Sequence, residues 1–335
     1  MKSPFKYLLL LFLALVTFFT YQASFDHAFT QLDDQVQVVN NTAIRSLSLE
    51  NLKTIFSSTS VGMYQPFTTF VYAVIYQFSD LNAWGYHFTA FLFHLLNGYL
   101  VFRLLRAFNQ SFPFAFLLSS IFLLHPIQVE SVAWVSALSN LCFTSFYLLS
   151  LLAYLSYLKS SKKIYLIWSL VAFLFSLFSK STAVTLPLVL LLFDYYHENS
   201  WKLKRMLEKA PYFMLSILFG IITLNSREAA GHLSDLSINF DLIDRVFLVA
   251  YSVIFYPFKF LFPLKLSVFY PYPELQNGFL PWFYYAALPA VLLLAFLIYR
   301  FRKKTLLWLG ALFYLFSISV MLQLIPVGNQ LTTDR

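Results

Sequence analysis

The chain has little charge and a single cysteine. Charged residues make up 11% of its 335 residues, whereas 59% are hydrophobic and the mean hydropathy is +0.69. An ordinary soluble domain carries about 25% charged residues, so this chain cannot cover its own surface in water. The composition excludes a soluble enzyme and predicts an integral, multi-pass membrane protein.

The lone Cys142 excludes an internal disulfide, and its apolar surroundings predict a small core residue. Aromatic residues reach 20% of the chain, which favours long lipid-facing helices over a β-barrel of short alternating strands. The net charge of +8 suggests a nucleic-acid partner in a soluble chain. Here the basic residues follow the membrane topology instead, so we expect a lipid bilayer around the chain and no nucleic acid.

Long apolar runs predict the helices. A membrane-spanning helix needs about 20 apolar residues, and nine runs reach or approach that length: residues 7–21, 86–102, 112–124, 141–158, 164–178, 182–195, 212–224, 279–299 and 306–327. The fold class predicted is all-α, a polytopic helical bundle with about 9–11 transmembrane helices. No repeat at a fixed period appears, so we expect one domain over residues 1–335, with a first outer loop over residues 23–85.

A further run, residues 246–262, does not fit a simple crossing. It is interrupted by Pro257 and Lys259, and proline in a helix interior removes a hydrogen bond. A full crossing here would also reverse the sides of the loops that follow. We therefore expect a re-entrant or interfacial element on the outer side, or a hairpin of two short helices.

Basic residues orient the predicted bundle. Fifteen of the 23 basic residues lie in five clusters, and only three acidic residues accompany them. The clusters are at positions 2 and 6, 103 and 106, 159–163, 202–209 and 300–304. The positive-inside rule makes these segments and the N-terminus cytoplasmic. The opposite side, which is periplasmic in a bacterial inner membrane or lumenal in the endoplasmic reticulum, then carries about twelve acidic and eight basic residues.

The first outer loop predicts two short helices. Ser48 can cap an amphipathic helix that runs through Ser57. Residues 67–78 follow Pro66 and are apolar on all sides, but they are too short to span, so we expect them to be interfacial or buried.

Asp33 and Asp34 form the first candidate site, just past the first predicted helix. Adjacent carboxylates repel each other, which raises one pKa or attracts a cation. Such a pair can serve as a catalytic base or hold a divalent cation, which would be the cofactor. The alternative is a solvated pair of loop residues.

Two further sites lie at the outer ends of predicted helices. Glu130 stands in a nearly apolar segment, and an ionisable residue at membrane depth is costly unless it has a function or a partner. His125 lies five residues earlier, and its alternative role is a structural hydrogen bond to a backbone carbonyl. Lys180 is an isolated outer cation that suits an anionic phosphate, with snorkelling as the alternative.

Other polar residues predict structural roles. His87, His94 and Asn97 share one face of a predicted helix, where helix-to-helix hydrogen bonding is expected. Asp194 ends a predicted helix on the cytoplasmic side, where we expect a boundary role.

Several motifs occur in a characteristic order. They are Leu32-Asp33-Asp34-Gln35-Val36, Val39-Asn40-Asn41, Tyr64-Gln65-Pro66-Phe67-Thr68, Tyr86-His87, Leu95-Leu96-Asn97, His125-Pro126 with Glu130-Ser131-Val132-Ala133-Trp134-Val135, Ser179-Lys180-Ser181, Tyr270-Pro271-Tyr272-Pro273, Pro326-Val327-Gly328 and Asp334-Arg335. Together they resemble the membrane region of the tetratricopeptide-containing transmembrane O-mannosyltransferases and their bacterial homologues, in the GT-C glycosyltransferase superfamily. The resemblance runs from about residue 25 to residue 335.

The resemblance implies a membrane enzyme that transfers a mannose-like sugar from a polyprenyl-phosphate donor to a protein or glycan acceptor on the outer face. The family's catalytic carboxylate then falls on Asp33 or Asp34, with Glu130 beside it in the cavity. His125, Lys180, Asp334 and Arg335 match positions expected to bind substrate or phosphate.

Two departures from the family pattern stand out. An Arg-x-Asp element of the family is replaced here by Leu138-Ser139-Asn140, which removes one ion pair. The family's C-terminal tetratricopeptide repeats are also missing, so the sequence predicts a truncated or minimal form. The alternative functions are a transporter or a scaffold that binds lipid-linked sugar without chemistry.

Overall fold

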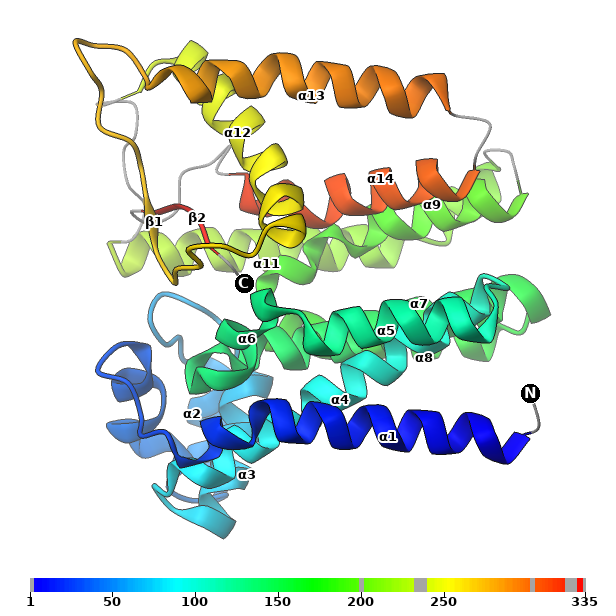
Figure 1. Cartoon of the computed structure of the whole chain (residues 1–335). Coiled ribbons are helices and arrows are strands. Elements are labelled where there is room, and N and C mark those ends of the chain that lie inside the picture. The colour runs from blue at the N-terminus through cyan, green and yellow to red at the C-terminus, as the bar shows by residue number, and fades with distance from the viewer. Residues whose placement is uncertain (1–2, 199–201, 232–239, 302–304, 323–329, 334–335) are drawn as a thin grey trace. The chain divides into compact units, whose positions relative to one another are not determined.

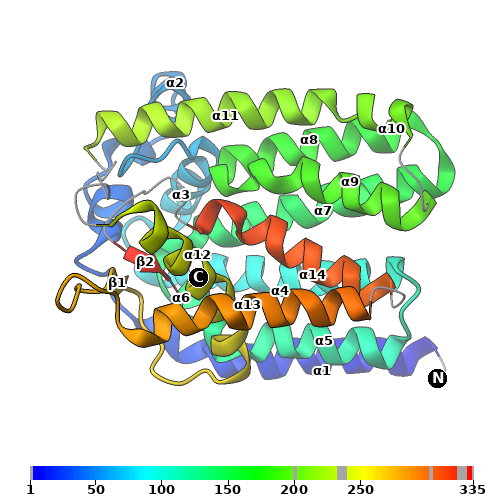
Figure 2. The same cartoon turned by 90° about the horizontal axis from the view of Figure 1, so that it is seen from above.

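The computed structural model describes residues 3–198, 202–231, 240–301, 305–322 and 330–333. These residues are almost entirely helical, and they contain one small antiparallel sheet, formed by β1 (Tyr270–Pro271) and β2 (Gln330–Thr332). The all-α prediction is confirmed. The chain divides into two compact units, which appear in Figures 1 and 2: unit 1 is Met1–Ala183 with Leu218–Ser226, and unit 2 is Val184–Ile217 with Arg227–Arg335.

Unit 1 holds the first eight helices. They are α1 (Ser3–Tyr21), α2 (Leu49–Ser57), α3 (Pro66–Ser79), α4 (Ala83–Ala107), α5 (Phe112–Leu124), α6 (Val129–Ala133), α7 (Leu138–Ser160) and α8 (Lys163–Ser179). Short helical turns connect them: η1 (Gln22–Asp26), η2 (Gln35–Val39), η3 (Thr42–Ile44), η4 (Pro126–Gln128) and η5 (Val135–Ala137), while η6 (Ser181–Thr185) continues into unit 2.

Unit 2 holds the remaining helices. They are α9 (Leu186–Glu198), α10 (Leu203–Leu207), α11 (Ala210–Ala229), which contributes to both units, α12 (Leu242–Leu261), α13 (Trp282–Arg300) and α14 (Thr305–Ile318) with the short turn η8 (Ser319–Met321). Helix α9 packs on α14, and α12 packs on α13.

Within the described residues, five helical stretches are long and apolar enough to cross a membrane: Pro4–Asp26, Ala83–Ala107, Val135–Ser160, Leu203–Ala229 and Trp282–Arg300. A pair bent by 50°, Phe112–Leu124 with Pro126–Ala133, makes a sixth. Two shorter apolar helices are Lys163–Ser179 and Leu306–Met321, and α9 has 13 residues. The polytopic class is thus confirmed. Nine to eleven crossings stay a prediction, because several runs form helices shorter than a full span.

Polar side chains join the long helices of unit 1. The His94 ring contacts the Leu123 carbonyl through Nε2 at 3.0 Å, which ties α4 to α5. Asn97 donates to the Leu141 carbonyl at 3.0 Å and accepts from the Ser145 hydroxyl at 2.6 Å, which ties α4 to α7. The predicted helix-to-helix hydrogen bonding of His94 and Asn97 is confirmed. His87 instead contacts the carbonyl of His27 in the first loop, at 3.1 Å.

Helices α7 and α8 form an antiparallel hairpin and pack against each other. The left-handed Ser161 (φ 57°) turns the chain between them. The Ser176 hydroxyl then donates to the Phe143 carbonyl at 2.9 Å, and the Phe146 and Phe175 rings stack 5.3 Å apart. This pairing fixes the C-terminal end of α8 beside the N-terminal end of α7.

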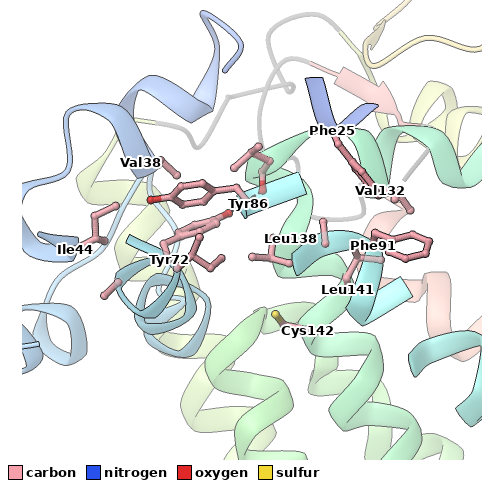
Figure 3. Packing of buried hydrophobic residues seen from close by; sticks show 14 of the residues in the cluster. Phe25, Val38, Ile44, Tyr72, Tyr86, Phe91, Val132, Leu138, Leu141 and Cys142 are labelled. Atoms are coloured by element: carbon pink, nitrogen blue, oxygen red, sulfur yellow. Dashed lines mark hydrogen bonds between the residues drawn. The ribbon is translucent and has the colours of Figure 1, made fainter. Parts of the chain in front are cut away.

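The first outer loop folds as predicted. Ser48 caps α2 by accepting from the Asn51 N–H at 3.2 Å, and α3 begins at Pro66. Figure 3 shows Val38 and Ile44 of this loop in one hydrophobic cluster with Tyr72 of α3 and Tyr86 of α4. Cys142 belongs to the same cluster and is fully buried, as expected. The loop is therefore a packed part of unit 1.

Residues 246–262 form most of one helix, α12, and not a hairpin. Pro257 lies inside it and cannot donate to the carbonyl of Val253, four residues earlier. The Tyr314 hydroxyl of α14 donates to that carbonyl at 2.8 Å. The tyrosine thus replaces the missing backbone donor and lets the helix continue through the proline.

Candidate functional site

The carboxylate of Asp34 accepts four hydrogen bonds. Its Oδ2 accepts from the Thr30 N–H at 2.8 Å and the Thr30 hydroxyl at 2.9 Å. Its Oδ1 accepts from the Ser136 N–H at 2.9 Å and also from the Ser136 hydroxyl. The side chain is buried. Four donors hold the Asp34 carboxylate in place, and the residue joins the first outer loop to η5.

Asp33 has a different environment. Its side chain is partly exposed, and within the described residues no hydrogen bond or ion pair engages its carboxylate. Because Asp34 is fixed and adjacent, the backbone presents Asp33 at a defined position. The pair therefore separates into a buried anchor and an accessible carboxylate.

A tryptophan and a tyrosine strengthen the same junction. The Trp134 indole donates to the Thr30 hydroxyl at 3.2 Å, so the threonine that holds Asp34 is itself held. The Tyr72 hydroxyl of α3 donates to the Val135 carbonyl at 3.0 Å. Burial raises the pKa of the Tyr72 phenol well above its usual value, so this donor keeps its proton at physiological pH.

Lys180 lies just after α8 and contacts the beginning of α7. Its ammonium donates to the Asn140 side-chain oxygen. The carbonyl of Ser179 accepts from the Thr68 hydroxyl at 3.0 Å, which ties this end of α8 to α3. Asn140 follows Ser136 by four residues, about one helical turn. One short stretch of chain therefore anchors both the Asp34 carboxylate and the lysine.

His125 and Glu130 lie on the connection that leads to this stretch. The Nδ1 of His125 accepts from the Ile127 N–H at 3.2 Å and ends α5 before Pro126. The structural alternative for His125 was a hydrogen bond to a backbone carbonyl, whereas the partner of Nδ1 is a backbone N–H. Both carboxylate oxygens of Glu130 are buried, and the Trp134 N–H donates to the Glu130 carbonyl at 3.2 Å. Glu130 thus lies on the connection that leads to Ser136, the residue that binds Asp34.

Two predicted site residues, Asp334 and Arg335, lie outside the described residues, so their roles stay predictions. The described part of the chain contains no group of three or more His, Cys, Asp or Glu that could hold a metal ion. Both oxygens of Asp34 already accept two hydrogen bonds each. This donor set does not suit a divalent cation at Asp34.

Comparison with known proteins gives one partial relationship. A stretch of 127 residues is 28% identical to a curated protein O-mannosyl-transferase of Caenorhabditis elegans. The match covers 35% of this chain and 18% of that relative, so the chain spans a small part of the relative's length. No family model matches the chain, and no solved structure matches it. The similarity agrees with the resemblance seen in the motifs, at a coarse level.

The sequence predicted the carboxylates and Lys180 but missed the residues that hold them. Thr30 lies four residues before Asp34, a spacing that permits local capping. Ser136 lies in an ordinary Val-Ser-Ala stretch, and its neighbouring residues do not predict that it binds Asp34, 102 residues earlier. Asn140 was visible as a departure from the family pattern, but its contact with Lys180 appears only in three dimensions.

Proposed function

We propose that this chain is a membrane glycosyltransferase that transfers a mannose-like sugar from a polyprenyl-phosphate donor to a protein or glycan acceptor. The reaction takes place on the periplasmic or lumenal side. The similarity to an O-mannosyl-transferase supports the reaction class. The observation that carries the site assignment is the division between Asp33 and Asp34: one carboxylate is partly exposed, whereas its neighbour is buried with four hydrogen bonds.

Asp33 is the catalytic base in this proposal. It takes the proton from the acceptor hydroxyl, whose oxygen forms a bond to the anomeric carbon of the sugar. The bond from that carbon to the phosphate oxygen breaks, and the polyprenyl phosphate leaves with the electron pair. General-base assistance of this kind contributes about 10² to 10⁴ in rate.

Asp34 is a positioning residue, because its oxygens hold the loop and not the substrate. A double displacement would need a second carboxylate about 5 Å from the first to act as nucleophile. The four hydrogen bonds on Asp34 make it a poor nucleophile, which supports a single displacement with inversion. Lys180 meets the donor phosphate, since an ammonium pairs well with phosphate oxygens. His125 and Glu130 lie on the connection that precedes Ser136 and Asn140.

The test replaces Asp33, Asp34 and Asp26 separately with asparagine. Asp26 is an exposed carboxylate in the same loop and serves as the matched control. Sugar transfer from polyprenyl-phosphate mannose is measured in membranes that contain each full-length variant. We expect Asp33→Asn to lower kcat at least about 100-fold with little change in KM, and Asp26→Asn to keep normal activity. An Asp33→Asn protein with wild-type turnover would overturn the assignment.

The competing function is a scaffold that binds lipid-linked sugar without consuming it. Purified wild-type protein that retains the sugar-bearing lipid, with no transfer to any acceptor, would favour the scaffold. The anomeric configuration of the product, compared with that of the donor, tests the single displacement directly.

A further inference from the structure

Asn140 combines burial with an unused hydrogen-bond donor. Its side chain is 8% exposed, and among the described residues Nδ2 has no hydrogen-bond partner. A buried amide hydrogen without an acceptor lowers the stability of the fold, so natural structures rarely leave one. This donor stands at the N-terminal end of α7, four residues after the Ser136 anchor.

The orientation of the amide follows from its neighbour. The Lys180 ammonium has three donors and no acceptor, so the atom of Asn140 that faces it must be the oxygen. The NH₂ group then points elsewhere. The amide cannot relieve its unpaired donor by flipping, because a flip would set NH₂ against the ammonium.

We infer that Asn140 and Lys180 together bind one anionic phosphate group, with the Asn140 Nδ2 donating to a phosphate oxygen. The inference rests on the proposed function, which makes that group the phosphate of the lipid-linked sugar. Asn140 both holds the lysine through its oxygen and supplies a second donor through its nitrogen. One side chain thus fixes the direction of the ammonium and adds a neutral contact.

The charge of this pair suits the donor lipid. A sugar phosphodiester carries one negative charge, and Lys180 with a neutral amide carries one positive charge. An aspartate at position 140 would cancel the charge of the lysine and offer only acceptors to the phosphate. The neutral side chain of Asn140 avoids this cancellation and leaves the positive charge of the lysine to the phosphate.

The experiment measures the binding of polyprenyl phosphate to the full chain in lipid nanodiscs. The same prenyl chain without phosphate, polyprenol, is measured beside it, so that the ratio of the two affinities isolates the phosphate contact. The variants are Asn140→Asp, the nearly isosteric Asn140→Leu, and Lys180→Met. Asn277→Asp, which makes the same charge change at an exposed turn of unit 2, is the matched control.

We expect wild type and Asn277→Asp to prefer polyprenyl phosphate. Asn140→Asp and Lys180→Met should lower that preference at least about tenfold, the factor that corresponds to about 1.4 kcal/mol. Asn140→Leu should lower it at least about threefold, with polyprenol affinity unchanged in every variant. A preference within twofold of wild type in both Asn140 variants would overturn the inference. If one variant fails to fold, the other still decides.

Two further arms separate the possible explanations. Inorganic phosphate at millimolar concentration should displace little polyprenyl phosphate, and full displacement would contradict a lipid-linked ligand. Asp33→Asn should bind polyprenyl phosphate as wild type does. Normal Asn140-dependent binding without sugar transfer would overturn the proposed function alone. Sugar transfer with Asn140-independent binding would overturn this inference alone.

Discussion

The carboxylate of Asp34 and Ser136 are joined by two hydrogen bonds across 102 residues of sequence. One donor is the Ser136 backbone N–H, at 2.9 Å, and the other is the hydroxyl of the same residue. A helical turn at residues 135–137 thus holds the first outer loop. The position of Asp33, the proposed base, depends on this contact because the two aspartates are adjacent in the chain.

The first prediction separates the two aspartates by stability. Asp34→Asn places an NH₂ group against at least one of the donors from Thr30 or Ser136, and it removes a charge that four donors stabilise. We expect it to lower the free energy of unfolding by about 2–3 kcal/mol. Asp33→Asn should change it by less than about 0.5 kcal/mol. Thermal unfolding in detergent measures both, and equal melting temperatures for the two variants would contradict the anchor role.

The second prediction concerns the Tyr72 hydroxyl. Tyr72→Phe leaves the Val135 carbonyl without its donor, so we expect a loss of about 1–2 kcal/mol of stability. Tyr76→Phe is the matched control, since that ring lies on the same helix and packs on Arg45. Thermal unfolding at pH 7 measures the difference, which should vanish if the hydroxyl contributes nothing.

The third prediction is that Tyr72 makes the stability of the fold depend on pH. Burial raises the pKa of Tyr72 above the ordinary value of about 10, so the unfolded chain releases the phenol proton first. The contribution of Tyr72 to stability is therefore fully present below about pH 10 and is lost as the pH rises toward the folded pKa. Unfolding measured from pH 7 to pH 11 should show wild type losing more stability above pH 10 than Tyr72→Phe does. Parallel curves would contradict this account.

A fourth prediction tests how α12 passes through Pro257. Tyr314→Phe removes the donor to the Val253 carbonyl and should destabilise the fold by about 1 kcal/mol. In a Pro257→Ala background the restored backbone N–H can serve that carbonyl, so the same change should cost much less. A double-mutant cycle by thermal unfolding gives the coupling, which we expect to be at least about 0.5 kcal/mol. Additive effects would show that the two residues act independently.

The sequence predicted much of this fold because its signals were local. The apolar runs, the Ser48 cap, the start of α3 at Pro66 and the burial of Cys142 all follow from neighbouring residues. The hairpin considered for residues 246–262 was wrong, because the partner that makes Pro257 tolerable, Tyr314, lies 57 residues further on.

At the candidate site, too, the sequence indicated the residues but not the contacts that they make with distant parts of the chain. The sequence indicated Asp33 and Asp34 as a pair but could not assign different roles to them, since the difference comes from Ser136 and Thr30. Likewise Lys180 was visible as an isolated cation, whereas its contact with Asn140 depends on the pairing of α7 with α8. Distant hydrogen bonds leave no periodic trace in a single sequence.

A final prediction concerns the buried ion pair of unit 2. The Lys209 ammonium donates to the Asp194 carboxylate and to the Arg205 carbonyl at 2.8 Å, and both charged side chains are almost fully buried. Removing one partner of such a pair leaves an uncompensated buried charge, which costs about 3–5 kcal/mol. We therefore expect Lys209→Met to lower the melting temperature strongly.

The control is a neighbouring pair. Lys202 contacts Glu198 at 2.8 Å, but its side chain is 61% exposed, so Lys202→Met should cost less than about 1 kcal/mol. Replacing both buried partners, with Asp194→Leu and Lys209→Met, removes the unpaired charge, and it should recover at least about 2 kcal/mol relative to Lys209→Met alone. Thermal unfolding of the four proteins in one detergent measures the series. A Lys209→Met protein no less stable than Lys202→Met would show that Asp194 gains other partners, and that the pair does not hold the end of α9 to the start of α11.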